Sequence, residues 1–507
     1  RPAPGPALGT EGRAKMAAGA GRYFCTAGRG MEPFLAREVR ERLGATEVDS
    51  VSGKVFFSTE AELGELRRLR AGERLFLLLK KHTPLAVSGN RGKMLHDIKC
   101  LVIEEPEYWL DIISVWRNLH GCEGKKDTVS QPSRLPQKRK AEETTTVTKR
   151  QETEQARETA SEECQAEAGE RCVVPERKTD QDHWTESQAS LAEPSQSPGE
   201  KPVADEQCSF SFRVSCRCSG AIARILTSQE IGRAIGIALI KQFGWRADLR
   251  DPDLEIFVHL NDIHSVVGIP LFRLPLANRE YIKVAGLRST VAWAMASLAE
   301  ISVSAFVLDP MCGLGTILLE AAKEWPEACY WGADISDSQL AGADENISAA
   351  GLTDKIELLK ASVKALPLPS DSFDAVISDV PFGKKFKIPK DTELLPDILQ
   401  EVERLLRVGG TVVLLLSHHL HKHTDGATQR AETESGDAVS HGAGETTAVK
   451  ALSVGGNSSS LVKGVESFPS SRHTHLGSLV LDSVYGVGLG KTDAFIHKYR
   501  KISSGGN

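Results

Sequence analysis

The pattern of hydrophobic and polar positions divides this chain of 507 residues into three ordered blocks. In the first block, the segment 32–43 carries Phe34, Leu35, Val39 and Leu43 at helical spacing, which predicts a helix with one buried side. The same block predicts strands at 23–26, 54–58 and 75–79, and further helices at 62–69, 94–103 and 109–119. We therefore expect an α+β domain of ferredoxin type over residues 16–122.

The second block begins at Phe210 and alternates between apolar and polar residues. Segments 212–217 and 254–260 alternate as half-buried strands do, and 266–270 together with Leu274 should continue the sheet. Between them, Thr227 followed by Glu230 is a capping box, which predicts a helix to about Phe243. This second domain is expected over residues 208–276.

The third block alternates strand patterns with helix patterns. Apolar runs at 305–308, 330–334, 356–359, 373–378 and 411–417 predict five strands, the fifth after a glycine turn at 409–410. Two further strands, 479–487 and 493–499, should form a closing hairpin. Alternating strands and helices predict a parallel sheet covered by helices. We therefore expect an α/β domain with a Rossmann-like sheet over residues 277–417 and 476–502.

Polar segments separate these blocks. Residues 123–207 and 418–475 contain few bulky apolar residues, which predicts disorder because they cannot bury enough surface. Residues 1–15 are expected to be a disordered extension outside the fold. Lys138–Lys140 fits either a nuclear import signal or a solvated charge cluster. The segment 418–423 holds four histidines, but an insert without an ordered scaffold is favoured over a metal site there, and we expect no metal.

Composition narrows the class of protein further. The net charge of −6 does not indicate a nucleic-acid binder, although acidic linkers can mask basic domains. No run of about 18 apolar residues exists, so no membrane span is expected. The ten cysteines form no CxxC pair, and Cys216 and Cys218 are the one close pair, which favours free thiols in a reducing compartment, cytosol or nucleus.

The candidate chemistry centres on the segment DPMCGLGT, residues 309–316. Gly313 and Gly315 lack a Cβ atom, so a ligand can approach the backbone there, and the following helix points its amides at that ligand. Asp334 ends the next strand 19 residues after Gly315, where an acid can hold ribose hydroxyls. Leu318 occupies the position of the third glycine of a dinucleotide fingerprint, which counts against a dinucleotide. An acid, a proline and an aromatic residue leave the fourth strand, as at the edge of a pocket.

The motifs DPMCGLGT, GADIS and SDVPFG occur in the order found in S-adenosylmethionine-dependent amino-methyltransferases, which they resemble. With the upstream blocks, the chain resembles the THUMP-domain RNA guanine-N2-methyltransferases. This resemblance implies S-adenosylmethionine as cofactor and places its contacts at Asp309, Met311, Gly313, Gly315, Thr316, Asp334 and Ser362. It implies a catalytic loop of Asp379, Pro381 and Phe382. Val380 and Ser362 depart from the residues common in the family, a proline and an aspartate.

The second block resembles a THUMP domain, an RNA-binding module, and basic residues supply its surface for phosphates. Lys283 and Arg288 lie in the segment 281–298, which resembles the GLRPT entry helix of the family, with Ser289 at the proline position. We expect RNA contacts at Arg213, Arg217, Arg224, Lys241, Arg246, Arg250, Lys283 and Arg288. Each residue alone is more often a solvated charge, but as a face beside a methyltransferase domain RNA contact is favoured.

The expected function is therefore methylation of the exocyclic N2 amine of a guanosine in a structured small RNA, either a small nuclear RNA or a tRNA. The resemblance also implies a heterodimer with a small zinc-binding activator subunit at an edge of the catalytic sheet, although the pattern at 335–340 does not identify that edge. We expect a nuclear protein, with the cytoplasm as the alternative. Two other functions stay open: a non-catalytic RNA-binding scaffold, and a methyltransferase acting on adenine N6 or a protein amide. Cys312 fits small packing better than a catalytic nucleophile.

Overall fold

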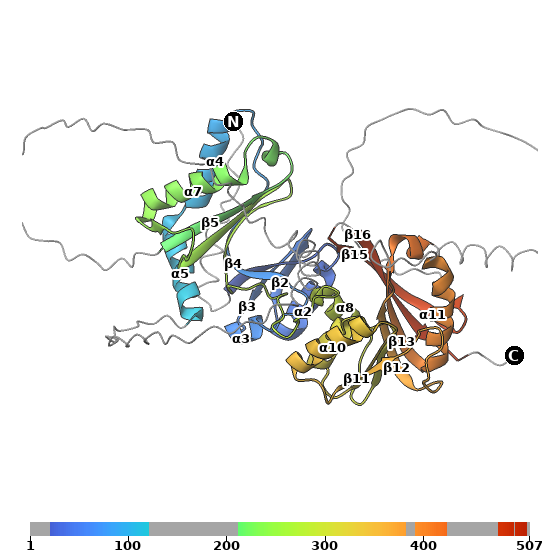
Figure 1. Ribbon diagram of the computed structural model, residues 1–507. Helices are drawn as coiled ribbons and strands as arrows, with labels where there is room; N and C mark the ends of the chain where they lie inside the picture. The colour runs from blue at the N-terminus through green and yellow to red at the C-terminus, as the bar shows by residue number, and fades with distance from the viewer. Residues whose placement is uncertain (1–20, 121–210, 382–390, 423–474, 491, 504–507) are drawn as a thin grey trace, which may run out of the picture. The chain divides into compact units, whose positions relative to one another are not determined.

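The computed structural model describes residues 21–120, 211–381, 391–422, 475–490 and 492–503 (Figure 1). These residues form two eight-stranded sheets with helices. The predicted disordered segments 1–15 and 123–207 lie outside the described residues, as does most of 418–475. None of the helices in the described ranges is long and apolar enough to cross a membrane.

The first sheet joins strands from both predicted upstream modules, in the order β2-β3-β1-β4-β8-β7-β5-β6. Its strands are β1 (Gly21–Thr26), β2 (Thr46–Val51), β3 (Lys54–Thr59), β4 (Arg74–His82), β5 (Ser211–Cys218), β6 (Arg246–Ala247), β7 (Leu254–Leu260) and β8 (Ser265–Pro270). β4 and β8 pair antiparallel, with Phe76 opposite Pro270. The two modules, which the sequence presented as separate units, therefore share one continuous sheet.

Helices cover one face of this first sheet. They are α2 (Glu32–Leu43), α3 (Leu63–Leu66), α4 (Arg91–Ile103), α5 (Pro106–Leu119), the 3₁₀ turn η1 (Ile222–Arg224) and α7 (Ser228–Phe243). The predicted capping box is present in α7, where Thr227 Oγ1 accepts from Glu230 N at 3.2 Å and Glu230 Oε2 accepts from Thr227 N at 2.9 Å. Trp109 of α5 packs against Phe243 of α7 and against Trp245. These helices thus hold both modules over one apolar core.

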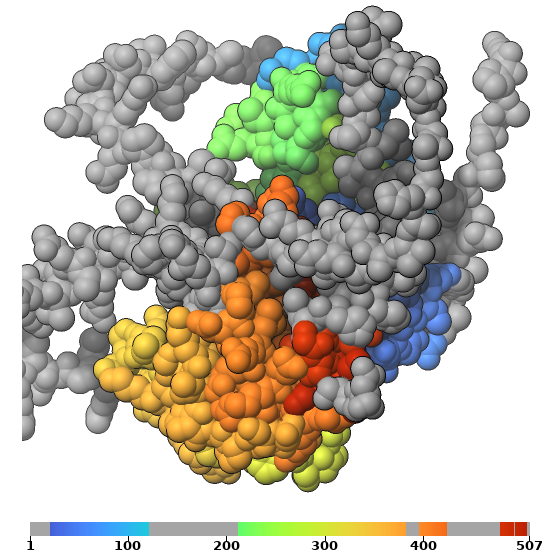
Figure 2. Space-filling model, turned by 90° about the vertical axis from the view of Figure 1, so that its right-hand side faces the viewer, coloured from blue at the N-terminus to red at the C-terminus, as the bar shows by residue number. Residues whose placement is uncertain are grey.

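The second sheet has the order β11-β10-β9-β12-β13-β16-β15-β14. Its strands are β9 (Phe306–Asp309), β10 (Cys329–Asp334), β11 (Ile356–Lys360), β12 (Phe373–Asp379), β13 (Leu406–Ser417), β14 (His475–Leu476), β15 (Leu479–Leu489) and β16 (Thr492–Lys501). β9 to β13 run parallel, and β16 is antiparallel to β13 and β15. This confirms the predicted parallel sheet and its closing hairpin. In Figure 2 the hairpin (red) lies beside the orange segment that contains β13, in agreement with their pairing.

Helices lie on both faces of the second sheet: α8 (Ser289–Leu298), α9 (Thr316–Glu324) and α10 (Asp337–Ala350) on one, and α11 (Asp391–Leu405) on the other. Val307, Ile377 and Val413 belong to the core of the first group. Leu308 and Val376, one position away, belong to the core beneath α11. Because successive strand residues point to opposite faces, both faces are apolar.

Several local predictions were wrong. The segment 281–288 is a loop, and the helix begins at Ser289. Leu274 is 57% exposed in a bend rather than part of the sheet. Gly409 and Gly410 lie within β13, where the register with β12 shifts, so they form an irregular strand stretch and not a turn. β2 was missed because its residues are mostly exposed and lack an apolar alternation.

Candidate active site

Three acids follow one another at the carboxyl edge of the second sheet. Asp309 ends β9, Asp334 ends β10 and Asp379 ends β12. β9 lies between β10 and β12, and all three strands are parallel. Strand order reverses at β9, so the carboxyl edge there is the switch point at which open α/β sheets bind ligands. The structure thus brings together the acids that the sequence singled out.

The glycine-rich turn between β9 and α9 adopts a backbone conformation that glycine permits. Gly313 has φ 51° and Gly315 has φ 74°, in the left-handed region that favours glycine. Gly313 N donates to Asp334 Oδ2 at 3.0 Å, and Met311 N donates to Asp309 Oδ1 at 3.2 Å. Asp309 at the end of β9 and Asp334 at the end of the adjacent β10 therefore hold the turn through its backbone N–H groups.

Asp309 is a buried acid, whereas Asp379 is half-buried and buries its Oδ1 atom. Asp309 is 1% exposed, and Ser378 Oγ donates to its Oδ1 at 2.9 Å. Asp379 Oδ1 is buried and has no hydrogen-bond partner among the described residues. Burial raises the pKa of each carboxyl to about 7. A buried acceptor without a donor is costly, so Asp379 is an acid suited to a ligand with N–H or O–H groups.

Two other predicted cofactor residues also line this edge. Thr316 opens α9, and its hydroxyl oxygen is buried without a partner in the described part of the chain. Ser362 follows β11, and the preceding Ala361 N donates to the Asp334 carbonyl at 3.1 Å, which keeps Ser362 near Asp334. Pro381 is half-buried just beyond Asp379, whereas Phe382 lies outside the described residues. Cys312 is buried against Gly332, as expected for a packing residue.

Asn346 is a buried site residue that sequence reasoning missed. It lies on α10 and is fully buried. Its Oδ1 accepts from the backbone N–H groups of Lys283 and Val284 at 2.7 and 2.9 Å. Its Nδ2 donates to the carbonyls of Val284 and Leu314 at 3.0 and 3.1 Å. One amide thereby fastens the segment before α8 to the glycine-rich turn, which no sequence motif indicated.

The predicted basic residues do not form one surface. Arg213 and Arg217 lie on the side of β5 that faces away from α7, and Arg213 pairs with Glu255 at 2.7 Å. Lys241 is exposed on α7, which covers the opposite face of the sheet. Arg224, Arg246 and Arg250 are also exposed, in η1, in β6 and in the turn that follows β6. Lys283 Nζ donates to the Glu280 carbonyl at 2.8 Å, and Arg288 forms an ion pair with Glu73 at 3.4 Å.

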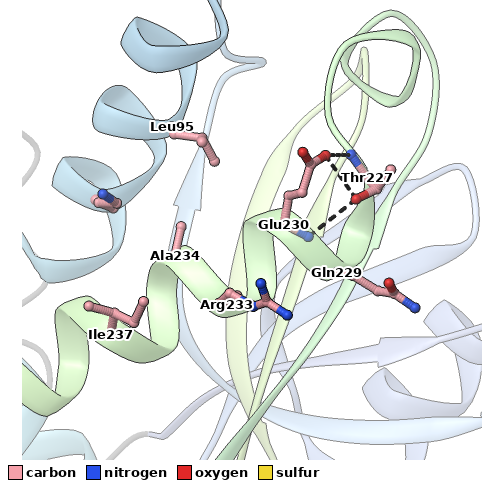
Figure 3. A pocket seen from close by; sticks show the side chains of 8 residues that line it. Leu95, Thr227, Gln229, Glu230, Arg233, Ala234 and Ile237 are labelled. Atoms are coloured by element: carbon pink, nitrogen blue, oxygen red, sulfur yellow. Dashed lines mark hydrogen bonds between the residues drawn. The ribbon is translucent and has the colours of Figure 1, made fainter. Parts of the chain in front are cut away.

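Two further features lie away from the strand-end acids. A groove of about 380 Å³ between α4 and α7 is lined by Leu95, Glu230 and Ile237, among others (Figure 3). Residues 418–422 form an ordered helical turn, so the expectation that no ordered scaffold surrounds these histidines was wrong for this part. His421 Nδ1 lies 3.0 Å from His497 Nε2 of β16 and its ring stacks on Phe495. Among the described residues, no group of three or more His, Cys, Asp or Glu side chains could hold a metal ion.

Comparison with known proteins identifies the domains and the relatives. Residues 277–440 match the RMKL-like methyltransferase domain, and residues 191–269 match the THUMP domain. The U6 snRNA (guanine-N(2))-methyltransferase THUMPD2 of Bos taurus is 52% identical, with 96% of this chain and 97% of that protein covered. The tRNA (guanine(6)-N(2))-methyltransferase THUMP3 of Bos taurus is 28% identical over 76% of this chain and 79% of that protein. The crystal structure of TrmN from Thermus thermophilus has a TM-score of 0.57 at 19% identity, covering 95% of this chain and 99% of that one.

The Rossmann-like sheet and its domain match define an S-adenosylmethionine-dependent methyltransferase joined to a THUMP module. The chain belongs to the THUMP-domain RNA guanine-N2-methyltransferase family. The fold class and family expected from the sequence are thereby confirmed.

Proposed function

We propose that this protein transfers a methyl group from S-adenosylmethionine to the exocyclic N2 amine of a guanosine in a small structured RNA. The observation that carries the proposal is Asp379, whose buried Oδ1 has no partner among the described residues at the carboxyl end of β12. A guanine amine offers two N–H donors to such an acceptor. Asp379 and the Val380 carbonyl would accept these two hydrogens and aim the nitrogen lone pair.

The residues of the glycine-rich turn fit the cofactor. Thr316 supplies a buried hydroxyl without a partner in the described part of the chain, and the positive φ of Gly313 and Gly315 lets the turn bring its backbone to the ligand side of the sheet edge. Asp334 already accepts from Gly313 N, but a carboxylate has about four lone-pair sites and can accept ribose hydroxyls as well. Asp309 and Met311 would border the amino-acid end, and Ser362 the adenine. The cofactor supplies an activated methyl group, so the protein contributes mainly positioning and charge.

Each neighbouring group has a separate role in that positioning. Val380 N donates to the Leu415 carbonyl at 3.1 Å, which ties the start of the catalytic loop to β13. Pro381 restricts the backbone after this tie, since its ring fixes φ. Phe382, which lies outside the described residues, would stack on the base. The guanosine must be unpaired or flipped out of a helix to reach Asp379.

A small nuclear RNA is the favoured substrate. The relative named as a U6 snRNA methyltransferase shares 52% identity, against 28% for the relative named as a tRNA methyltransferase. A nuclear location follows from this substrate, with the cytoplasm as the site if tRNA is methylated instead. The THUMP module and the continuous first sheet would hold the RNA, with its exposed basic residues on the phosphates.

We also propose that a small zinc-binding activator subunit docks on the edge strand β11. Within the described residues, β11 pairs with β10 alone, which leaves its other backbone edge open. The segment 335–340 is a bend and the start of α10, so the edge lies at β11 instead. Ile335, 69% exposed after the neighbouring β10, adds apolar surface near that edge. A partner strand can pair with such an edge through main-chain hydrogen bonds.

The test is methyl transfer to RNA from cells that lack this protein, with labelled S-adenosylmethionine and with or without the activator. We expect label in N2-methylguanosine of a small nuclear RNA, and a loss of at least about a hundredfold in Asp379→Ala. The RNA would be sized before digestion, and the nucleosides identified by mass spectrometry. Label in N6-methyladenosine or in protein would contradict the proposed acceptor. Cofactor binding without any labelled product would leave a non-catalytic RNA-binding protein.

A further inference from the structure

The first sheet is strongly curled, which creates a concave face opposite its helices. Lys54 Nζ of β3 lies 2.5 Å from His259 Nδ1 of β7, although β1, β4 and β8 lie between these strands in the sheet. In a flat sheet, four strand spacings would separate them by roughly 19 Å. The curled face must therefore bring β3 opposite β7. Four aromatic rings, those of Phe24, Phe56, Phe76 and Phe257, fill its interior and form a separate small core.

Basic side chains gather at one end of this concave face. We define the basic cluster as Lys54, Lys81, Arg217, His259 and His264, which come from β3, β4, β5, β7 and the turn between β7 and β8. Asp49 of β2 pairs with one member of the cluster, Lys81, at 2.5 Å. Among the described residues, no carboxylate lies within ion-pair distance of Lys54 or Arg217. The cluster therefore holds more positive charge than the protein itself neutralises.

Two members of the basic cluster are buried without adequate partners. Lys54 is 3% exposed, and its Nζ contacts Nδ1 of His259. His264 is also 3% exposed, and neither of its ring nitrogens has a hydrogen-bond partner within the described ranges. The His264 ring stands edge-on to the rings of His259 and Phe56, so it faces into the cluster. Proteins rarely bury a lysine or leave both nitrogens of a buried histidine unpaired.

The titration behaviour of the cluster supports the same view. Burial and the Arg217 charge lower the pKa of Lys54 to about 8. Burial and the Lys54 charge lower the pKa of His259 to about 3 and that of His264 to about 4, with Lys81 adding to the second. Burial and the neighbouring positive charges thus both favour the unprotonated forms of these side chains. A bound anion would reverse these shifts, because an opposite charge favours the protonated form of lysine and histidine.

We propose that the basic cluster is a binding site for one phosphate group of the RNA substrate, an inference that rests on the proposed RNA-directed function. The exposed Arg217 would meet the phosphate first, Lys54 would turn from His259 to pair with it, and His264 would donate a hydrogen bond. RNA is favoured over an acidic peptide because Arg217 shares a strand of the THUMP module with Arg213, along which a backbone of repeated charges can run.

Lys54→Met tests this site because it removes the charge and keeps much of the side-chain length. The matched control is Arg273→Met, which removes one exposed charge, paired with Asp251, from the segment that follows β8 of the same sheet. Binding of a labelled short single-stranded RNA to the full chain would be measured by fluorescence anisotropy over a series of salt concentrations. We expect about tenfold weaker binding at low salt for Lys54→Met. The salt slope, which is the decrease of log affinity with log salt concentration, should be lower by about 0.7, the value for one lost phosphate contact. Arg273→Met should bind as the unaltered protein does.

Thermal unfolding separates a binding role from a structural one. An uncompensated buried cation destabilises the fold, so Lys54→Met should keep or raise Tm while it weakens RNA binding. Lys54→Arg should restore the salt slope. A lower Tm with unchanged RNA binding, or a variant that does not fold, would show that Lys54 is structural and overturn the site. Polyglutamate serves as the acidic-peptide probe. If Lys54→Met loses polyglutamate binding but keeps RNA binding, the RNA assignment is wrong.

The RNA-binding result of the unaltered protein distinguishes this inference from the proposed function. If the unaltered protein methylates and binds RNA while Lys54→Met retains the full salt slope, the phosphate site is wrong and the function stands. If the unaltered protein binds no RNA, the proposed function fails and the phosphate site fails with it.

Discussion

At the scale of single residues, protonation of Asp379 should control the rate of methyl transfer. Its carboxyl can accept the amine hydrogens only when ionised, and burial raises its pKa to about 7. As pH falls below this value the acid becomes neutral, so the single-turnover rate should fall about tenfold per pH unit. The positive sulfonium of the cofactor favours the ionised form, so we expect the midpoint at or below pH 7. Single-turnover rates at saturating cofactor between pH 5 and 9 would measure it.

Asp379→Asn is the control for this pH profile. The variant cannot titrate at this position, so its low residual rate should be flat through the same range. Asp309 has a similarly raised pKa, but it would act on cofactor affinity, and saturating cofactor removes that contribution. A midpoint that persists unchanged in Asp379→Asn would assign the ionisation to another group.

The residues whose place in the fold the sequence predicted are those that follow strand ends. Asp309, Asp334 and Asp379 each follow a readable apolar strand, and parallel strands place their carboxyl ends at one edge. By contrast, the Lys54–His259 contact depends on sheet order and curl, which no local pattern contains. Asn346 was missed for a related reason, since its four bonds go to backbone groups far away in the chain.

At the scale of elements, Asn346 couples α10 to the glycine-rich turn. Asn346→Ala would leave the N–H groups of Lys283 and Val284 and the Leu314 carbonyl without these partners. We expect a loss of about 3 kcal/mol in the free energy of unfolding. Cofactor affinity should fall by about tenfold to a hundredfold, because the turn that carries Gly313 and Gly315 loses its support. Denaturant unfolding and calorimetric titration with S-adenosylmethionine would measure the two effects.

Glu345→Ala is the control for α10, because this neighbouring side chain is exposed on the same helix. It should change neither quantity by more than about 0.5 kcal/mol. Asn346→Asp retains an acceptor for the two backbone N–H groups but loses both donors. Its free energy of unfolding and its cofactor affinity should therefore lie between those of the alanine variant and the unaltered protein. Equal cofactor affinity in all four proteins would show that the Asn346 hydrogen bonds do not support the cofactor site.

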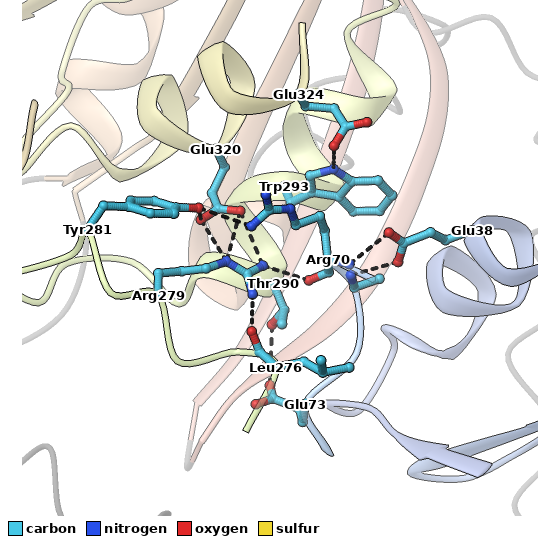
Figure 4. A network of polar contacts seen from close by, with 11 residues as sticks. Glu38, Arg70, Glu73, Leu276, Arg279, Tyr281, Thr290, Trp293, Glu320 and Glu324 are labelled. Atoms are coloured by element: carbon cyan, nitrogen blue, oxygen red, sulfur yellow. Dashed lines mark hydrogen bonds and ion pairs between the residues drawn. The ribbon is translucent and has the colours of Figure 1, made fainter. Parts of the chain in front are cut away.

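At the scale of the whole described protein, a buried polar network joins the catalytic domain to the first sheet (Figure 4). Arg279 Nε donates to Oε1 of Glu320 on α9 at 3.0 Å, and Arg279 Nη2 donates to the Arg70 carbonyl at 3.0 Å. Tyr281 donates to Glu320 Oε1 at 2.7 Å. Glu38 of α2 accepts from the N–H groups of Arg70 and Ala71 at 2.7 and 2.9 Å. The helix that follows the glycine-rich turn is therefore bonded to a segment that α2 holds in place.

Removing Glu320 should separate the RNA-binding and catalytic functions. Arg279 and Glu320 side chains are 3% and 1% exposed, so Glu320→Ala leaves a buried charge without its partner. Breaking such a pair costs about 3 to 5 kcal/mol. Calorimetry should show a lower Tm and, because the network spans both sheets, a transition that splits in two. Methylation of RNA should fall further than cofactor affinity, since the RNA module would lose its fixed position while the glycine-rich turn keeps its Asn346 bonds.

Glu324→Ala provides the contrast on the same helix. Glu324 pairs with Arg42 of α2 across the same two domains, but this pair is more exposed, at 18% and 29%, so its loss should cost about 1 kcal/mol or less. Glu320→Ala should therefore lower Tm and RNA methylation more than Glu324→Ala does, whereas cofactor affinity should not distinguish the two variants. If both variants unfold in a single transition and lose RNA methylation equally, burial of the network does not govern how the two domains act together. A fall in cofactor affinity as large as the fall in methylation would instead place the effect of Glu320 on α9 alone.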